Sequence, residues 1–387
     1  MKTAHIVVVG AGPVGLAAAL ALARLPGVAV TLVAQHKIAA PTLAEVDHRV
    51  YALAPASIKF LASLGAVIDL TRAGPVRAMA VFGDRAENNE TALNFNTGAP
   101  LAHIVEHSNL LVALVKAVVN TPQIVLRENA PIADVTTREG RHTLSFADGK
   151  PLTCTLLIAA DGGHSPLRER MQIESQIVDY ASAGVVANFK LAQSHHDTAR
   201  QWFARDGVLA LLPLPNNVVS MVWSVANARA AELVSLSPAA LCAAVACATH
   251  LQADEFELVS AVTSFPLKRQ LARDWVLPGF ALVGDAAHTI HPLAGQGLNL
   301  GLADVRVLAE SLAARGTLSD VGDVALLRRY ARARAEPAWA MGSATGGLRA
   351  LFASEDAALT WARNRGLALL EKSPTLKTLF TDYASTA

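Results

Sequence analysis

The stretch HIVVVGAGPVG, residues 5–15, decides the fold of this chain. Residues 6–9 are all β-branched, which predicts a buried strand. The three glycines that follow predict a tight turn, and Pro13 suits the first turn of the Ala- and Leu-rich helix expected at residues 14–25. A second apolar strand is expected at residues 28–33. The start of the chain therefore predicts a strand–helix–strand unit and a parallel sheet.

The glycines of this turn also have the spacing of a dinucleotide-binding fingerprint. The first glycine would make the turn, the second would let a pyrophosphate approach the backbone, and the third would let the helix pack on the strand. The helix N-terminus would face the negative charge. A glycine-rich turn without a ligand is the alternative. We predict cofactor contacts at Gly10, Gly12, Pro13, Val14 and Gly15.

The end of the second strand departs from the fingerprint. An acidic residue that binds the ribose hydroxyls is expected there, but the sequence has Ala34 and Gln35. Glu45 and Asp47 lie too far along the chain to replace it. We therefore predict that Gln35 contacts the ribose through its amide, with weaker retention of the cofactor.

Composition excludes several classes of function. The 387 residues carry a net charge of +1, so no surface-wide field attracts nucleic acid, and 52% hydrophobic against 17% charged residues permits apolar pockets or subunit contacts. Cys154, Cys242 and Cys247 show no ligand spacing and are expected to be buried in a protein of a reducing compartment. Residues 6–23 carry no charge, but their glycines and Pro13 oppose a signal peptide or membrane helix. We expect a soluble, cytoplasmic protein.

The later part of the chain alternates between helical and strand-like segments. Helices are expected at 109–119, 239–249 and 298–315. A β meander with strands at 132–137 and 142–146 leads to a buried strand at 156–160. An antiparallel second domain is predicted from strand-like runs at 184–190, 209–214, 218–225 and 257–265. A buried run at 280–283 then indicates a return to the first domain, which is therefore discontinuous in sequence.

A second motif, DGGHSPLR at 161–168, follows a buried strand. It places Asp161 and Gly162 at the strand end, where the first motif also lies. Asp-Gly after a strand is also a common turn, so the motif alone decides little.

The third motif, GDAAHTIHPLAGQGLNLG at 284–301, is longer. It has Asp285 at a strand end, then a loop rich in Pro and Gly, and then a helix. The first backbone N–H groups of a helix have no partner within it, so those of Gly297, Leu298 and Asn299 are placed to stabilise negative charge.

In this order the three motifs resemble the single-component FAD-dependent aromatic hydroxylases of the para-hydroxybenzoate hydroxylase type. The third motif is most similar to that of the ubiquinone-biosynthesis hydroxylases. The likeness extends over nearly the whole chain through RVYAL at 49–53, IVE at 104–106, ALLPL at 210–214 and VWS at 222–224. Where many relatives have an arginine after the sequence IVEH, this chain has Ser108.

The resemblance implies FAD as the cofactor, NADPH or NADH as a transient reductant, and dioxygen as the source of a hydroxyl group placed on an aromatic ring. By this likeness Arg49 lies along the FAD phosphates, Asp161 near the pyrophosphate and Asp285 on the ribityl chain. The helix that begins at Gly297 would stabilise the negative charge of the reduced flavin.

The fold class implied is α/β, with a Rossmann-like FAD-binding domain, an interleaved antiparallel-sheet substrate domain and a helical C-terminus. The predicted boundaries are 1–79, 99–175 and 269–340 for the FAD-binding domain, 80–98 and 176–268 for the substrate domain, and 341–387 for the C-terminal helical region.

The loop within the third motif is expected at the flavin. We predict that Pro292 shapes the loop edge against the flavin ring and supplies a carbonyl, and that Gly295 contacts the cofactor. His291 is a candidate acid or base. Ordinary hydrogen bonding is the alternative for His291 and for His288. No third ligand follows these histidines at suitable spacing, so no metal site is predicted.

The C-terminal part contains a basic run, Arg328, Arg329, Arg332 and Arg334, with Tyr330 inside it. A solvated helix face together with core or subunit packing is the first interpretation. The second is contact with a membrane surface or a partner enzyme, which would suit a substrate with an isoprenoid tail.

Three functional hypotheses follow. The leading one is hydroxylation of a polyprenylated phenol in ubiquinone biosynthesis. A small soluble phenol or benzoate is the alternative substrate, and a benzoate would require a buried Arg or Lys in the second domain. The third is a non-catalytic scaffold subunit, suggested by Ala34 and Ser108. Predicted partners are a homo-oligomer or a complex with other quinone-biosynthesis proteins, and a peripheral contact at the inner face of the membrane, with no nucleic acid.

Overall fold

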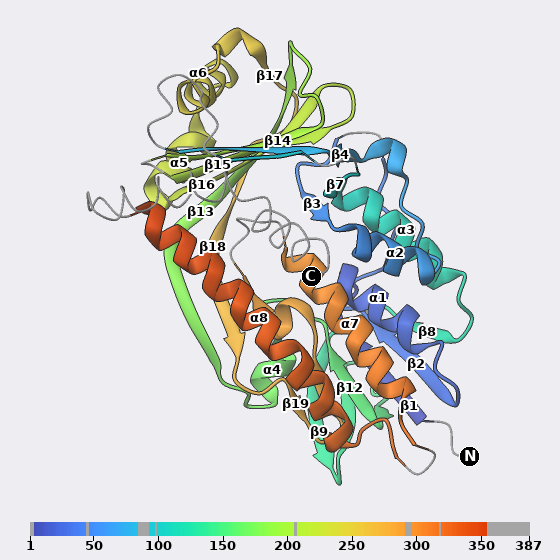
Figure 1. Cartoon of the computed structure of the whole chain (residues 1–387). Coiled ribbons are helices and arrows are strands. Elements are labelled where there is room, and N and C mark those ends of the chain that lie inside the picture. The colour runs from blue at the N-terminus through green and yellow to red at the C-terminus, as the bar shows by residue number, and fades with distance from the viewer. Residues whose placement is uncertain are drawn as a thin grey trace.

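The computed structural model describes residues 4–43, 46–83, 93–96, 99–204, 207–290, 296–316 and 319–353. Two large sheets dominate it, a mainly parallel sheet near the N-terminus and a mainly antiparallel sheet that lies across the top of the view in Figure 1. The fold class predicted from the sequence is confirmed. The exact domain boundaries stay a prediction.

The mainly parallel sheet contains the predicted strand–helix–strand unit. Its strand order is β19-β20-β12-β1-β2-β8, and all neighbours from β20 to β8 are parallel. The strands are β1 (Ala4–Val9), β2 (Val28–Val33), β8 (Ile124–Arg127), β12 (Leu156–Ala159), β19 (Val276–Leu277) and β20 (Phe280–Leu282). Because β20 pairs with β12, the chain returns to its first sheet after a long excursion, as the buried run at 280–283 indicates.

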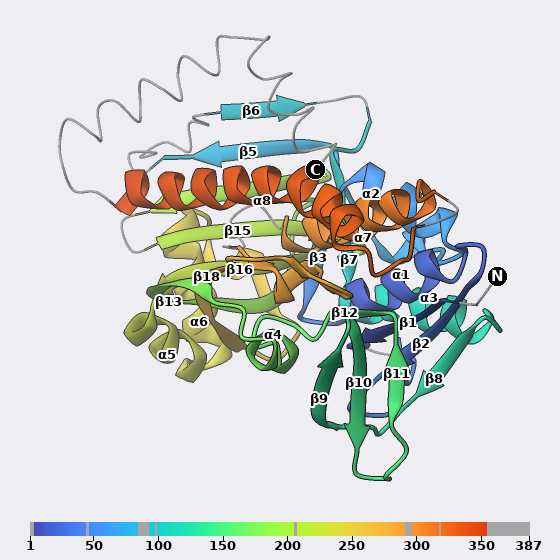
Figure 2. The same cartoon turned by 90° about the horizontal axis from the view of Figure 1, so that it is seen from below.

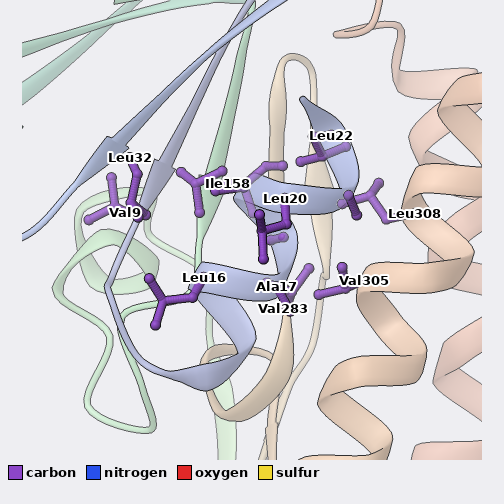
Figure 3. Close-up of a cluster of buried hydrophobic side chains, with 14 of the residues drawn as sticks. Val9, Leu16, Ala17, Leu20, Leu22, Leu32, Ile158, Val283, Val305 and Leu308 are labelled. Carbon is purple, nitrogen blue, oxygen red and sulfur yellow. The ribbon is translucent and has the colours of Figure 1, made fainter. Parts of the chain in front are cut away.

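The core of this part joins the sheet to helices α1 (Pro13–Leu22) and α7 (Gly297–Ala313). Figure 3 shows Leu20 of α1, Ile158 of β12 and Leu308 of α7 in one buried apolar cluster. Small side chains bring the two helices close together, since a Cβ added at Gly301 would lie 2.7 Å from Val14 Cγ2. Helix α1 ends three residues before the predicted residue 25, because Pro26 disfavours helical backbone in the residue that precedes it.

The mainly antiparallel sheet has the order β21-β18-β13-β16-β15-β14-β5-β6, with β17 paired to β13; its β14–β5 pair is parallel. The strands are β5 (Ala78–Phe82), β6 (Leu93–Asn96), β13 (Ser175–Leu191), β14 (Thr198–Ala204), β15 (Gly207–Leu214), β16 (Val218–Ala226), β17 (Phe256–Leu258), β18 (Thr263–Ala272) and β21 (His288–Thr289). Helices α5 (Asn227–Ser235) and α6 (Pro238–Thr249) lie on one side of it (Figure 1).

Two expectations for this sheet were wrong in detail, and one strand was missed. The run 257–265 is two strands, β17 and β18, because the chain between them turns back to Asn188, whose backbone N–H donates to Ser260 Oγ. Strand β13 begins at Ser175 rather than at 184. Strand β14 was not predicted, because Arg200 and Gln201 interrupt its apolar pattern.

Two smaller sheets and several helices complete the fold. The predicted meander is confirmed as the antiparallel sheet β11-β10-β9, and β3-β7-β4 form a second three-stranded sheet. These strands are β3 (Val50–Leu53), β4 (Gly74–Val76), β7 (Ala102–Glu106), β9 (Ile132–Arg138), β10 (Arg141–Phe146) and β11 (Leu152–Cys154). The remaining helices are α2 (Pro55–Ser63), α3 (His107–Val119), α4 (Pro166–Arg170), α8 (Val324–Ala353), and the 3-10 turns η1 (Leu70–Arg72), η2 (Ala253–Glu255) and η3 (Gly284–Ala286).

Helix α8 runs alongside α7 in both views (Figures 1 and 2). Arg328, Arg329 and Arg332 are exposed on it, as a solvated face requires. Arg334 and Tyr330 are buried, so the basic run is only partly a surface feature.

Two further expectations can be compared with the described residues. Cys154 and Cys242 are buried as expected, but Cys247 is exposed, on α6. Within the described ranges, no helix combines the length and the apolar character needed to cross a bilayer.

Candidate active site

A cavity of about 1130 Å³ lies between the first turns of α1 and α7 and one face of the mainly antiparallel sheet. Pockets for one small ligand usually measure roughly 300–1,000 Å³, so this one has room for a dinucleotide together with a second molecule. The predicted cofactor residues that line it are Gly12, Pro13, Val14, Arg49, Gly162, Asp285, Gly297 and Leu298. The three motifs therefore converge on one space.

The remaining predicted residues lie elsewhere or are not described. Gly10, Gly15, Gln35, Asp161 and Asn299 are not among the residues that line the cavity. His291, Pro292 and Gly295 lie outside the described residues. The roles predicted for these three residues stay predictions.

The first glycine turn is built by close backbone contacts. Gly10 has a φ of +111°, and a Cβ there would lie 2.2 Å from the carbonyl oxygen of Ala160. A Cβ at Gly15 would lie 1.9 Å from the carbonyl oxygen of Gly10. Gly12, by contrast, has open space in the direction of its missing Cβ and lines the cavity. The outer two glycines therefore shape the turn, and the middle one leaves room for a ligand.

Ala34, at the end of β2, is held by the backbone. Its N–H donates to the carbonyl of Arg127 and its carbonyl accepts from the N–H of Ala130. Gln35 beyond it is exposed and outside the cavity lining. A ribose contact through the Gln35 amide remains a prediction.

Arg49 is presented to the cavity by a clamped loop. The Asp47 carboxylate accepts from the N–H of Arg49 at 2.9 Å and from the N–H of Ser108 at 3.0 Å. The N–H of Asp47 donates to Glu106 Oε1 at 2.8 Å. Ser108 itself is buried at the start of α3. Asp47 thus fixes the Arg49 loop to α3.

Two residues of the site were missed by the sequence reasoning. Tyr51 and His107 both line the cavity, and the Tyr51 hydroxyl lies 3.0 Å from His107 Nδ1. Burial raises the pKa of Tyr51 to about 12, and it lowers the pKa of His107. The hydroxyl and the imidazole are therefore placed for a hydrogen bond, and the tautomer of His107 decides which of them donates. The only signal for this pair was that Tyr51 lies in RVYAL and that His107 follows IVE.

Asp161 and Arg168 of the second motif stabilise the strand end. Asp161 Oδ2 accepts from the N–H of Leu167 at 3.1 Å, and burial raises the pKa of this carboxyl. Its Oδ1 is buried without a partner among the described residues. The Arg168 guanidinium donates to the carbonyl oxygens of Gly163 and Ala286, which joins the second motif to the third.

Asp285 is the acidic side chain of the third motif in the cavity lining. Its side chain is open to the cavity, and partial desolvation by the surrounding protein raises the carboxyl pKa. The interactions with His288 and Arg49 lower this pKa, and the nearby Asp304 raises it. Asp285 is therefore an acceptor at the cavity whose carboxyl holds a proton more readily than a free aspartic acid does.

Helix α7 begins at Gly297 without a side-chain cap, and Gln296, Gly297 and Leu298 line the cavity. Asn299 is fully buried, and its side chain points back to the β3–α2 turn. Its Nδ2 donates to the carbonyl of Ala52 at 2.8 Å, and its Oδ1 accepts from the N–H of Ala54 at 3.0 Å. The Asn299 side chain therefore positions the end of α7. The role predicted for Asn299, stabilising negative charge, concerns its backbone N–H.

His288 is enclosed by protein side chains rather than by the cavity. It is buried, its Nε2 lies 2.6 Å from Asp304 Oδ2, and its ring stacks on Trp275. It does not line the cavity. This arrangement favours the hydrogen-bonding interpretation of His288. Among the described residues, no cluster of three or more His, Cys, Asp or Glu could hold a metal.

Comparison with known proteins identifies the family. A family model described as an FAD binding domain matches residues 3–345. The chain is 33% identical to the 3-demethoxyubiquinol 3-hydroxylase of Escherichia coli, with 98% of each protein covered. It is 32% identical to the mitochondrial ubiquinone biosynthesis monooxygenase COQ6 of Drosophila melanogaster, over 86% of this chain and 78% of that one. The chain belongs to the family of FAD-dependent ubiquinone-biosynthesis hydroxylases.

Solved structures show that this hydroxylase shares its fold with more distant proteins. The chain resembles the p-nitrophenol 4-monooxygenase PnpA of Pseudomonas putida with a TM-score of 0.78 and 19% identity, covering 100% of this chain and 99% of that one. HpxO of Klebsiella pneumoniae, solved with FAD and uric acid, gives a TM-score of 0.76 and 20% identity, with 99% and 97% covered. At these identities the likeness concerns the fold alone.

The residues of this hydroxylase fit FAD. Two helix N-termini without side-chain caps, at Gly12 and Gln296, border the same cavity, and such ends favour anionic groups. Arg49 adds a positive charge, and Asp285 adds an acceptor for a hydroxyl group. Gly12 leaves the backbone open to close approach.

Proposed function

We propose that this protein hydroxylates the electron-rich ring of a polyprenylated phenol in ubiquinone biosynthesis, with NADPH or NADH as the reductant and dioxygen as the oxygen source. One observation carries the proposal. The cavity that the FAD motifs line continues along a largely apolar face of the mainly antiparallel sheet, where Val208, Leu212 and Val222 lie. An apolar wall opposite a flavin site suits an aromatic ring with a hydrocarbon tail.

The residues of the chain have separate tasks in this reaction. FAD, when bound, supplies the transfer of electrons to dioxygen and the activated oxygen atom. The backbone N–H groups at Gly297 and Leu298 are placed to stabilise negative charge on the ring system, and Arg49 to pair with the phosphates. Asp285 would bind a ribityl hydroxyl. The apolar wall would exclude water from the reacting atoms.

The distribution of charge favours this substrate class over a benzoate. A buried carboxylate requires a paired cation. Among described residues of the sheet that line the cavity, Lys268 is the cationic one, and its Nζ lies 3.2 Å from His164 Nε2. It is partly exposed rather than buried in the wall. The sheet wall therefore suits a neutral substrate.

The direct test supplies the FAD-loaded protein with a geranylphenol, NADPH and isotopically labelled dioxygen. We expect one labelled oxygen atom in the product, detected by mass spectrometry. Labelled product from small phenols but not from geranylphenol would support the alternative substrate class. A purified chain that binds no FAD and oxidises no NADPH, even with added FAD, would support the scaffold hypothesis instead.

A second test uses cells that lack the protein. Their lipid extract is expected to accumulate a quinone precursor that lacks one ring hydroxylation, and the structure of that precursor names the ring position. A normal quinone profile would remove the assignment. Contact of the exposed arginines of α8 with a membrane surface, and assembly with other quinone-biosynthesis proteins or with a second copy, remain predictions.

A further inference from the structure

Side chains alternate between the two faces of a strand, and this alternation determines which residues of the mainly antiparallel sheet face the cavity. On β15, Val208, Ala210 and Leu212 line the cavity, whereas Leu209 and Leu211 belong to the core on the opposite face. Small and apolar side chains on the cavity face leave room for a flat ring. A polar side chain on this face therefore stands out against its surroundings.

Strand pairing places five of these residues in one row, which we call the wall row. Register pairs Gln201 with Ala210, Ala210 with Val222, Val222 with Val186, and Val186 with Thr263. All five line the cavity. The three central members are apolar, and the polar members stand at the two ends. The wall row thus offers an apolar surface bordered by Gln201 on β14 and Thr263 on β18.

Gln201 is the unusual member of the wall row. It is 7% exposed, and in the part of the chain that the structure describes its amide makes no side-chain hydrogen bond. The Gln201 amide is not among the buried side-chain atoms that lack a partner, so it is accessible from the cavity that it borders. A ligand that fills this part of the cavity displaces solvent from the amide and must replace its hydrogen bonds.

The chemistry of an amide indicates which ligand group that is. A primary amide offers a donor and an acceptor, and it is neutral, so it matches a hydroxyl or ether oxygen better than a carboxylate. The adjacent wall row is apolar and fits the ring itself. We propose that the Gln201 amide binds a hydroxyl or alkoxy oxygen on the substrate ring and so determines which ring carbon faces the flavin side of the cavity. This inference rests on the proposed function.

The test combines a change in the ligand with a change in the protein. Ortho-geranylphenol and geranylbenzene differ by one hydroxyl group, and both are titrated into the FAD-loaded protein while the flavin absorbance reports binding. The wild-type protein is expected to prefer the phenol by about fivefold to tenfold, the size of one hydrogen bond. Gln201→Leu is expected to bind the two ligands equally, because its side chain has similar size and no polar atom.

Two further variants keep the result interpretable. Gln176→Leu removes an exposed glutamine from β13 that does not line the cavity, and it is expected to keep the preference for the phenol. Gln201→Asn withdraws the amide by one methylene and is expected to reduce the preference without abolishing it. It also provides the answer if Gln201→Leu does not fold.

Turnover gives an independent readout. With Gln201→Leu, NADPH oxidation is expected to continue while the share of it that yields hydroxylated product falls, or the product becomes a mixture of ring positions. If Gln201→Leu keeps both the preference for the phenol and a single unchanged product, the role of Gln201 is overturned, and the proposed function stands. Failure of the wild-type, FAD-loaded protein to bind or hydroxylate any prenylphenol would remove the proposed function, and this inference with it.

Discussion

Arg334 of α8 and Asp304 of α7 form an ion pair that is almost completely buried, with 2.9 Å between Nε and Oδ1. The other carboxylate oxygen of Asp304 accepts from the N–H of Gly284 at 3.0 Å and contacts His288 Nε2. One carboxylate therefore connects the C-terminal helix, α7 and the start of the third motif. The loop that carries Asp285 depends on a cation from a distant part of the chain.

Removing that cation is expected to destabilise the protein strongly. Arg334→Met leaves the Asp304 carboxylate buried with less compensation, which costs about 3–5 kcal/mol in comparable cases. Urea unfolding measures the change in the free energy of unfolding. Adding Asp304→Asn to Arg334→Met is expected to recover part of the loss, since it removes the uncompensated charge. Strictly additive losses in the double variant would show that the two residues are not coupled.

Asp285→Asn is expected to raise the stability of the FAD-free protein and to lower its affinity for FAD. Burial raises the carboxyl pKa of Asp285, so ionisation of this group at neutral pH works against folding. The amide removes this charge, and the FAD-free protein should unfold at a higher temperature. FAD affinity should fall by roughly tenfold to a hundredfold, because a hydrogen bond to a charged acceptor contributes about 1.5–3 kcal/mol. Fluorescence titration with FAD and thermal unfolding of the FAD-free protein test the two halves. A loss of both stability and affinity contradicts this account.

The two glycines of the first turn are expected to respond differently to alanine. Gly10→Ala places a Cβ 2.2 Å from the Ala160 carbonyl oxygen at a φ of +111°, so the protein should be destabilised by more than about 2 kcal/mol. Gly12→Ala meets open space, and its stability should change by less than about 1 kcal/mol. FAD affinity should nevertheless fall in Gly12→Ala, because the methyl group projects into the cavity. Equal stability of the two variants would disprove the division of roles.

We expect protonation of His107 to destabilise the folded protein in acid. Burial lowers its pKa in the folded protein below the ordinary value of 6.5. Below pH 6.5 the unfolded chain therefore binds more protons, and stability is lost as the pH falls through the folded pKa. Above pH 6.5 the contribution is complete.

Unfolding free energies measured on both sides of pH 6.5 test this for His107→Gln, which should show a shallower decline in acid. Some decline should remain, since burial also lowers the pKa of His103 and of His142. Tyr51→Phe serves as the control, because it removes the hydroxyl but keeps the histidine. An unchanged slope in His107→Gln would assign the acid sensitivity to other groups.

Local patterns predicted the elements that depend on local physics. The β-branched run of β1, the glycine turn and the buried strands before Asp161 and Asp285 were correct, because side-chain shape and turn chemistry act within a few residues. The return of the chain to its first domain at residues 280–283 was predicted from the same signals, and the pairing of β20 with β12 agrees with it.

Features that depend on distant partners were not predictable in this way. Arg334 lies in a basic run that has the appearance of a solvated face, but its partners, the Asp304 carboxylate and the Leu300 carbonyl, lie on α7, far earlier in the sequence. From the sequence, Asp47 was considered only as a candidate acid for the ribose hydroxyls. In the structure its carboxylate accepts hydrogen bonds from the backbone N–H groups of Arg49 and Ser108. Gln201 broke the apolar pattern of β14 and so hid the strand, and the same residue borders the cavity.

The position of β12 between β1 and β20 has a consequence for biosynthesis. Strand β1 ends at Val9, but its sheet is not complete until β20 at Phe280–Leu282 has been translated. Strand β12 ends at Ala159, and at roughly 5–20 residues per second about 6–25 s pass before Leu282 has been added. During that time the nascent chain exposes an unpaired edge of β12, so chaperone binding to this edge would protect it from aggregation until the last strand arrives.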